Sequence, residues 1–413
     1  MSEPLNTQKT RKSAFMERLL DGVEVEWKSL GELSQIYGGL TGKSKKDFEA
    51  GNTKYISYKN IFNNIDVNFT ELDLVQVADG ENQHEVKYGD VLFTGSSETA
   101  AEAGMSSAVT INFDEKVYLN SFSFGVRFYD DNLLIPEFSK YLFRSHFMRR
   151  AIAKTASGVT RFNVSKLRFK KLLIPIPPLS IQKEIVRILD TFTELTAELT
   201  AELTARKKQY AYYRDELLSF DSTKDTKSAK NVEWKTLGEI GENLDSKRKP
   251  ITGGLREPGD IPYYGASGIV DYVKDYIFEG DYLLVSEDGA NLIARNTPIA
   301  FSISGKTWVN NHAHVLKFQT YEDRRYIEYY LNSIDLTPYI SGAAQPKLNK
   351  RNLNSIKIPN PPQEVKQRIV TILDKFDTLT ASISEGLPKE IALRKKQYEY
   401  YREMLLTFPK HEE

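Results

Sequence analysis

The chain has 413 residues, with 56 basic and 56 acidic side chains and no cysteine. This length allows two or three domains with a hydrophobic core each. The absence of cysteine excludes disulfides, thiolate metal sites and cysteine nucleophiles, and it fits a reducing cytoplasm. Because no apolar run approaches ~18 residues we expect no membrane contact, and because the net charge is zero, any contact with nucleic acid has to come from local basic patches.

The first part of the chain predicts an N-terminal segment, residues 1–22, and then a domain over residues 23–172. Short alternating apolar runs rich in glycine and aromatic residues indicate strands in this domain, and Pro136–Lys154 indicates a helix. Nine basic and no acidic residues lie between Arg144 and Lys171. A solvated helix face can explain part of this cluster. The rest indicates contact with a polyanion, because each Lys or Arg on a phosphate displaces a counterion.

Residues 173–221 predict one long helix. After the prolines at 177 and 178, apolar residues recur in steps of four and three, which is the spacing of a coiled-coil seam and requires a partner helix. Within the seam, Thr-Ala-Glu-Leu occurs at Thr196–Leu199 and again at Thr200–Leu203. Residues 222–231 are expected to be a linker.

The remainder of the chain repeats this plan, with a second domain at residues 232–356 and a second long helix at residues 357–413. A helix is expected near Glu322–Ile334 within the domain. The sequence Gly386-Leu387-Pro388 interrupts the second seam. Because proline removes a hydrogen bond inside a helix, we expect a kink or a restart there.

Three stretches of the sequence are repeated within the chain. VEWKSLGEL (residues 25–33) returns in similar form 207 positions later, IPIPPLSIQKEIVRILDTFTEL (174–195) returns 184 positions later, and RKKQYAYYRDELLSF (206–220) returns 188 positions later. The copied parts are the helices and their flanks, whereas the blocks between them differ. We therefore predict an α+β protein: two mixed α/β domains joined by two long antiparallel coiled-coil helices, with pseudo-two-fold symmetry. Two-fold symmetry facing two spaced half-sites is how dimeric DNA readers work.

These motifs resemble the specificity subunits (HsdS) of Type I restriction–modification systems over essentially the whole chain. The Thr-Ala-Glu-Leu repeat, GVEVEW and EGLPKEIALRKKQYEYYR resemble the Type IC branch in particular. The resemblance implies a non-catalytic, DNA-binding subunit of a bacterial defence system, in which each domain is a target recognition domain that reads one half of a split site in double-stranded DNA.

The resemblance also implies partners. Two modification (methyltransferase) subunits would dock on the helices, and restriction/translocase subunits would complete the complex, so that adenine methylation and restriction are directed by this chain. No cofactor is expected on the chain itself; S-adenosylmethionine is expected on the modification subunits, and ATP and Mg on the restriction subunits.

The resemblance further suggests that the repeat containing Thr196, Leu199, Thr200 and Leu203 spaces the two readers. Four residues add about 6 Å and a net rotation of about 40° to a helix, whereas one base pair adds about 3.4 Å and about 35°. We therefore hypothesise that one repeat unit changes the unread gap by about one base pair.

Candidate DNA contacts are side chains on loops and strand ends that mix basic, aromatic and hydrogen-bonding groups, because arginine reads guanine, amides read adenine and carboxylates read cytosine. A packing or surface role is the alternative for each. In the first domain they are Lys43, Tyr55, Ser57, Lys59, Asn60, Ser96, Ser97, Thr160, Arg161 and Lys166. In the second domain they are Tyr263, Tyr264, Ser267, Glu287, Asn291, Asn310, His312, Gln345 and Lys347.

The RKKQY sequence, at 206–210 and 394–398, is copied between the halves whereas the candidate readers are not. An identical partner requires an identical surface, so we assign helix pairing and the docking of methyltransferase subunits to these copies. Solvated pairs spaced four residues apart are the alternative. The assigned residues are Arg206, Lys207, Tyr210, Arg394, Lys395 and Tyr398.

Three stretches imitate catalytic or metal motifs. GGLTGKS (residues 38–44) ends like a phosphate-binding loop, but its first glycine is one residue too close. PNPPQ (359–363) imitates the loop of adenine methyltransferases, but Gln363 cannot stack on a flipped base. His312 and His314 have no third ligand in view, so we expect neither catalytic residues nor a metal. The rival interpretation of the chain is a structural coiled-coil scaffold with two heads that bind ligands other than DNA.

Overall fold

The structure, a computed structural model, describes residues 18–20, 22–220, 232–342, 345–382 and 384–409. The chain divides into two compact units: unit 1 comprises residues 1–198 and 391–413, and unit 2 comprises residues 199–390. The predicted linker, residues 222–231, and the predicted N-terminal segment up to residue 17 lie outside the described residues. Within the described ranges, no helix combines the length and the apolar composition needed to cross a membrane.

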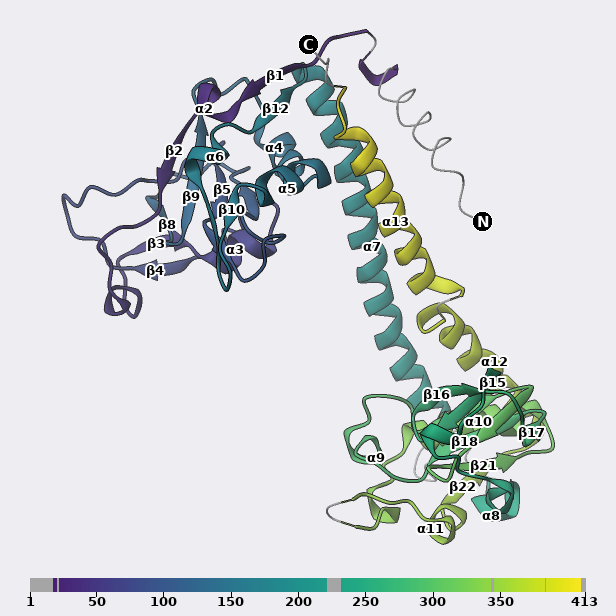
Figure 1. Ribbon diagram of the computed structural model, residues 1–413. Helices are drawn as coiled ribbons and strands as arrows, with labels where there is room; N and C mark the ends of the chain where they lie inside the picture. The colour runs from purple at the N-terminus through teal and green to yellow at the C-terminus, as the bar shows by residue number, and fades with distance from the viewer. Residues whose placement is uncertain (1–17, 21, 221–231, 343–344, 383, 410–413) are drawn as a thin grey trace. The chain divides into compact units, whose positions relative to one another are not determined.

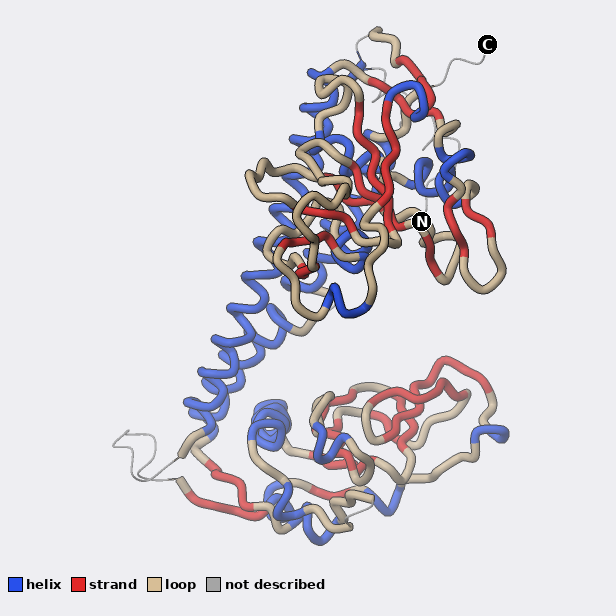
Figure 2. Tube along the Cα trace, turned by 90° about the vertical axis from the view of Figure 1, so that its left-hand side faces the viewer, coloured by secondary structure: helices blue, strands red, loops and turns tan. Residues whose placement is uncertain are grey.

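The described part of unit 1 contains three small sheets and one isolated strand pair. Its strands are β1 (Glu26–Ser29), β2 (Ser34–Gly38), β3 (Thr53–Ile56), β4 (Asp73–Val75), β5 (Val91–Thr94), β6 (Ser96–Ser97), β7 (Ser106–Ala108), β8 (Val117–Leu119), β9 (Ser123–Phe128), β10 (Ala156–Ser157), β11 (Phe162–Val164) and β12 (Leu173–Ile176). The sheet orders are β2-β9-β5-β7, β4-β3-β8 and β10-β11-β6, and Figure 2 draws the strands in red. β3 and β8 are parallel. β1 pairs with β12, so that the entry and the exit of the domain lie side by side.

Short helices pack against these sheets in unit 1. They are α2 (Leu30–Leu33), the 3-10 helix η1 (Lys45–Phe48), α3 (Tyr58–Asn63), α4 (Pro136–Leu142), α5 (His146–Ala153) and α6 (Lys166–Phe169). The single helix predicted over Pro136–Lys154 is wrong, because it divides into α4 and α5. Ser145 causes the break: its hydroxyl donates to the carbonyl of Leu142 at 2.6 Å and accepts from the amide of Met148, which caps a new helix.

The core of unit 1 is built on aromatic rings. Phe93 and Phe124 lie on neighbouring strands with ring centroids 5.4 Å apart, and Phe169 of α6 meets both rings edge-on at 4.9 and 5.1 Å. All three side chains are fully buried. This packing holds the strands from which the loops of unit 1 project.

The helix α7 (Leu179–Leu218) is continuous over 40 residues and belongs to unit 1 at its start and to unit 2 at its end. In unit 1 it packs against the end of α13 (Gly386–Leu405), where Phe192 stacks on Tyr401 with ring centroids 5.1 Å apart. In unit 2 it packs against α12 (Gln363–Thr380), where Tyr213 stacks on Phe376 at 5.7 Å. Within each unit the paired segments run antiparallel, as predicted (Figure 1).

The second long helix restarts where the sequence predicted an interruption. α12 ends at Thr380 and α13 begins at Gly386. Gly386 has a φ of +71°, and a Cβ atom there would lie 2.3 Å from the carbonyl oxygen of Thr378, so only glycine fits. Pro388 falls in the first turn of α13, where its missing N–H costs no hydrogen bond.

Unit 2 repeats the plan of unit 1 with different strand lengths. Its strands are β13 (Glu233–Thr236), β14 (Glu242–Asn243), β15 (Pro258–Gly265), β16 (Gly268–Val273), β17 (Phe278–Glu279), β18 (Tyr282–Ser286), β19 (Ala300–Ile303), β20 (Lys306–Val309), β21 (Ala313–Lys317) and β22 (Lys357–Asn360). The sheet orders are β14-β21-β18-β19 and β16-β15-β20-β17. β13 pairs with β22 as β1 does with β12, and the parallel pair β15–β20 repeats the parallel pair β3–β8.

The helices of unit 2 include one that fastens the domain to the long helices. Between β13 and α12 they are α8 (Leu237–Ile240), η2 (Asp245–Lys247), η3 (Gly253–Leu255), α9 (Asn291–Ala294), α10 (Tyr321–Ser333), η4 (Thr337–Tyr339) and α11 (Lys350–Asn354). α10 confirms the helix predicted near Glu322–Ile334. Its Tyr329 donates to Asp374 of α12 at 2.7 Å. In unit 1, Tyr141 of α4 donates in the same way to Asp190 of α7 at 2.5 Å. Both aspartates end the repeated Ile-Leu-Asp sequence.

Candidate nucleic-acid interface

Most of the predicted contact residues of unit 1 line two adjoining hollows of about 460 and 680 Å³. Tyr58 and Phe122 line both hollows, so the two form one continuous surface. The predicted residues that line the larger hollow are Lys43, Tyr55, Ser57 and Lys59. Those that line the smaller one are Ser96, Ser97, Thr160 and Arg161. Residues from positions 43 to 161 are thus brought to one surface by the strand order.

Arg161 is held in place at this surface. β11 pairs antiparallel with β6, so that Phe162 lies opposite Ser97. The Nε of Arg161 donates to the hydroxyl of Ser96 at 3.0 Å, and its guanidinium lies 5.7 Å from the centre of the Phe122 ring. Tyr58 donates to the carbonyl of Ser96 at 2.9 Å. Within the part of the chain that the structure describes, Nε is the only guanidinium nitrogen of Arg161 with a hydrogen-bond partner, so the two terminal amino groups keep the forked geometry that pairs with guanine.

Lys43 and Asn60 hold loops of unit 1. Lys43 donates to Glu81 at 2.6 Å, and its side chain is only 6% exposed. This hydrogen bond is the main reason why the pKa of Glu81 is lowered to about 2. Asn60 is buried and donates to the carbonyls of Asn68 and Glu71. Lys59 and Lys166 are exposed, although Lys166 lies outside the lining of the two hollows.

The basic cluster between Arg144 and Lys171 separates into buried and exposed members. Arg144 donates to the carbonyls of four residues, which are Ser106, Ile61, Phe62 and Asn64. Arg149 donates to the carbonyls of Ala101 and Ala103. Burial lowers the pKa of each guanidinium to about 10. These two arginines therefore hold loops of the domain, and the seven exposed residues that face solvent are Arg150, Lys154, Arg161, Lys166, Arg168, Lys170 and Lys171.

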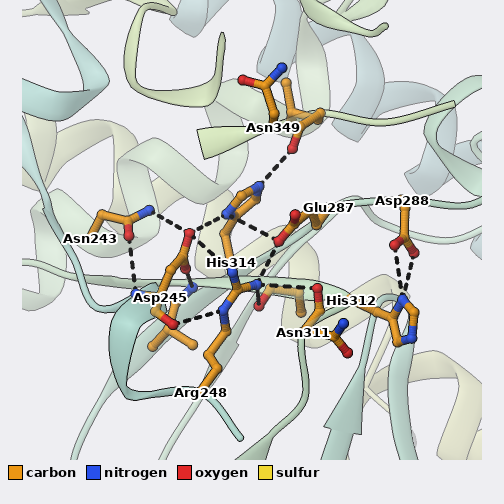
Figure 3. A network of polar contacts seen from close by, with 12 residues as sticks. Asn243, Asp245, Arg248, Glu287, Asp288, Asn311, His312, His314 and Asn349 are labelled. Carbon is orange, nitrogen blue, oxygen red and sulfur yellow. Dashed lines mark hydrogen bonds and ion pairs between the residues drawn. The ribbon is translucent and has the colours of Figure 1, made fainter. Parts of the chain in front are cut away.

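Two predicted residues of unit 2, Glu287 and His312, lie in or beside a buried polar network (Figure 3), and Lys347 contacts it. Glu287 accepts from Arg248 at 2.6 Å and lies 3.3 Å from the Nζ of Lys347. The Glu287 side chain is 12% exposed, so its carboxylate is engaged inside the protein. His312 lies at the edge of the network, where its Nδ1 is 2.9 Å from the carboxylate of Asp288.

His314 is at the centre of this network and is fully buried. Its Nδ1 lies 2.6 Å from Asp245, and its Nε2 lies 2.7 Å from the carbonyl oxygen of Leu348. Both ring nitrogens therefore face acceptor oxygens. Although burial acts to raise the pKa of Asp245, the hydrogen bond from His314 and the positive charges around it lower the pKa overall.

The network includes a group with the geometry of a metal site, which sequence reasoning could not find. Oxygen or nitrogen atoms of Asp245, Glu287 and His314 lie within 4.8 Å of one another. However, the guanidinium of Arg248 already lies against both carboxylates, 3.4 Å from Asp245 and 2.6 Å from Glu287. Two cations cannot share this space without strong repulsion, so the residues fit Arg248 and do not fit an additional metal ion.

The network fixes the loop that carries Gln345 and Lys347. The amide of Leu348 donates to the carbonyl of Glu287 at 2.7 Å, and Ser341 and Lys347 exchange two backbone hydrogen bonds of 2.8 and 2.7 Å. Gln345 and Lys347 are exposed on this loop. The buried charges therefore position the loop, and its exposed side chains are available to a ligand.

The other predicted residues of unit 2 divide between the core and the surface. Tyr263 is 1% exposed, and its hydroxyl accepts from the amide of Ile251. Tyr264 packs partly buried against a hydrophobic cluster. Asn291 closes a loop by two hydrogen bonds with Thr297. Ser267 is exposed at the turn between β15 and β16.

The predicted docking and spacer residues lie on the long helices. Tyr210 packs 6.1 Å from Phe376, and burial raises the pKa of Tyr210 to about 12. Tyr398 packs against the core of unit 1, where burial also raises its pKa. Arg206 and Arg394 donate to glutamines three residues further along their helices, whereas Lys207 and Lys395 are exposed. The spacer residues, which are Thr196, Leu199, Thr200 and Leu203, all lie within the uninterrupted α7.

Comparisons with known proteins identify relatives over nearly the whole chain. The family model described as "Type I restriction modification DNA specificity domain" matches residues 22–206 and 229–393. The chain is 34% identical to the type I restriction enzyme EcoR124I/EcoR124II specificity subunit of Escherichia coli, over 97% of this chain and 98% of that protein. It is also 34% identical to the EcoprrI specificity subunit of E. coli, over 90% and 92%. The crystal structure of a type I restriction–modification S subunit from M. genitalium shares the fold, with a TM-score of 0.53 and 17% identity over 95% of this chain and 98% of that chain.

Proposed function

Because the chain belongs to the family of type I restriction–modification specificity subunits, which are not themselves catalytic, we propose that it reads a bipartite site in double-stranded DNA, one half-site per domain. The two domains are hereafter called recognition domain 1, in unit 1, and recognition domain 2, in unit 2. The observation that carries the proposal is the gathering of polar, aromatic and basic side chains, among them Ser57, Lys59, Thr160 and Arg161, around one surface of recognition domain 1. Family membership favours this function over a scaffold that binds other ligands.

The electrostatics of recognition domain 1 support contact with a phosphate backbone. The chain as a whole has zero net charge, yet the seven exposed basic residues from Arg150 to Lys171 are accompanied by no acidic residue in that stretch. Each such residue that meets a phosphate adds salt-dependent affinity. Phosphate contacts position the domain, while groups such as Arg161 and Thr160 at the hollows would select the bases.

We propose that two modification subunits dock on the long helices and that restriction/translocase subunits join the full complex. The exposed lysines of the copied RKKQY sequence, Lys207 and Lys395, support this assignment because two copies of one partner need two copies of one surface. S-adenosylmethionine, ATP and Mg would then be held by these partners, and adenine methylation and restriction would be carried out there. We also propose that the chain works in the cytoplasm, because its proposed partner is DNA. Assignment to the Type IC branch stays a prediction.

Methylome sequencing tests the proposed function directly. The chain is co-expressed with its modification subunit in a host that has no other adenine methyltransferase. We expect methylated adenine within one split sequence, two defined blocks separated by a fixed unread gap. Methylation without sequence preference, or at one continuous block, would contradict the proposal. Cells with the modification subunit alone are the control and should show no methylated motif.

A further inference from the structure

The two recognition domains contain the same asparagine-locked turn. In recognition domain 1 the turn joins β8 to β9, and the side chain of Asn120 accepts from the amide of Phe122 at 3.0 Å. The amide of Asn120 donates to the carbonyl of Ile56 on the parallel strand β3 at 3.1 Å. The carbonyl of Phe122 accepts from the amide of Gly95 at 2.8 Å. Asn120 is buried, so these three hydrogen bonds fix the turn on its protein-facing side.

Recognition domain 2 repeats this turn bond by bond between β20 and β21. The side chain of Asn310 accepts from the amide of His312 at 2.8 Å. The amide of Asn310 donates to the carbonyl of Tyr264 on the parallel strand β15 at 3.0 Å, and the carbonyl of His312 accepts from the amide of Glu287 at 2.9 Å. Asn310 is also buried. Phe122 and His312 therefore occupy equivalent positions at the tip of a rigid turn.

The two tip residues present opposite chemistry. Phe122 is 65% exposed. It lies between the two hollows of recognition domain 1, next to Arg161. The His312 side chain is 51% exposed. Both carboxylate oxygens of Asp288 lie 2.9 Å from its Nδ1 (Figure 3). Nδ1 therefore carries a hydrogen that faces Asp288, and in the tautomer with its hydrogen on Nδ1 the exposed Nε2 is an acceptor.

We propose that this tip is a specificity-determining position in both recognition domains: Phe122 reads a thymine through its methyl group, and His312 reads an adenine or a cytosine by accepting from the exocyclic amino group. This proposal rests on the proposed function of reading DNA. Phenylalanine contact with the thymine methyl and hydrogen bonds to base amino groups are both available in the major groove. A pre-organised turn loses little conformational entropy on binding, so that a single tip side chain can discriminate between bases.

The test uses the whole chain assembled with its modification subunit. Phe122→Ala, His312→Ala and Tyr129→Ala are compared with the unchanged chain by methylome sequencing. Tyr129 is the matched control, because it is a 70% exposed aromatic residue that directly follows the far end of β9. All three side chains are exposed, so the variants are expected to fold, which circular dichroism confirms.

Each tip variant should relax the preference at one base pair of one half-site. We expect discrimination there to fall about tenfold, at thymine for F122A and at adenine or cytosine for H312A, with the other half-site unchanged. Y129A should match the unchanged chain. The proposal is overturned if the unchanged chain methylates a split site and both tip variants keep its full base preference, or lose methylation uniformly at all sites. If the unchanged chain methylates no split site, it is the proposed function that fails.

Discussion

The aspartate that ends each Ile-Leu-Asp sequence is predicted to fasten a recognition domain to its long helix. In unit 2, Asp374 of α12 accepts from three side chains of α10: Tyr321 at 2.8 Å, Arg325 at 2.9 Å and Tyr329 at 2.7 Å. The substitution Asp374→Ala removes all three hydrogen bonds at once. It leaves Arg325 with Asp377 at 2.9 Å and Glu328 at 2.8 Å, so the guanidinium keeps part of its neutralisation.

The structure gives the size of this effect. A hydrogen bond to a charged group contributes about 1.5–3 kcal/mol when it is sheltered. The bond from Tyr321 is exposed and contributes little. The other two hydrogen bonds are partly buried, but the Asp374 side chain is 26% exposed. Each of these two bonds therefore contributes at the low end of the range, and D374A should lower the free energy of opening α10 by about 3 kcal/mol. This corresponds to roughly a hundredfold increase in the local opening of α10.

Hydrogen exchange of the full-length chain, read by mass spectrometry, measures this opening. Peptides from α10 should exchange roughly a hundredfold faster in D374A, while peptides from α4 in unit 1 keep their rates. Asp190→Ala is the matched control: it removes the hydrogen bond from Tyr141 and the ion pair with Lys140 at 3.1 Å, and should accelerate α4 but not α10. Unchanged exchange of α10 in D374A, or equal acceleration of both helices, would refute the reasoning.

Further predictions concern the basic cluster, the spacer and pH. Arg144→Ala should lower the free energy of unfolding in urea by about 2–4 kcal/mol, because it leaves partly buried carbonyls without their donor, but it should not change the salt dependence of DNA binding by the assembled complex. Lys154→Ala, which removes an exposed charge of the same cluster, should reduce the slope of log K against log salt by about 1. Equal slopes for both variants would refute this assignment. Deleting residues 200–203 should shorten the methylated gap by about one base pair; an unchanged gap would exclude the spacer role. Burial raises the pKa of Tyr210 and of Tyr330 to about 12. As the pH rises, these hydroxyls therefore lose their protons in the unfolded state before they do so in the folded state. Stability in urea should therefore fall between pH 10 and 12, and Tyr210→Phe should reduce that fall.

The fold was predictable from the sequence because repetition is visible without coordinates. VEWKSLGEL and its copy predicted two equivalent domain entries, and each proves to be a strand that pairs with the strand entering its helix. The restart of the second long helix could be predicted from Gly386 and Pro388, because the backbone conformations that glycine and proline allow depend on the residue itself and not on the fold. The break at Ser145 was not predicted, because a serine in an apolar pattern can also lie inside a continuous helix. Ser145 caps a new helix only because a nearby backbone amide has its hydroxyl as acceptor, which the pattern does not show.

The candidate site was predicted in part, and its gaps have physical causes. Most of the residues predicted in recognition domain 1 lie at one surface, where strand pairing brings Ser96 to Arg161. Their contact with DNA stays a prediction. Phe122 was missed because an aromatic residue in the alternating SFSF pattern predicts a buried strand position, and its exposure depends on the turn that Asn120 locks. The network of Asp245, Glu287 and His314 was missed because its members are far apart in sequence and meet only through the sheet.

The internal repeat separates the residues that hold the domains from those proposed to read DNA. Asp190 and Asp374 are the same residue at equivalent positions, and each anchors its domain to a long helix. Asn120 and Asn310 are likewise the same residue, and each locks the same turn. At the tips of those turns the residues differ, and so do the exposed loops around them. A protein that places two readers in the same way but reads two different half-sites requires this division. A change in an anchoring residue would move a whole domain, whereas a change at a tip alters a single contact.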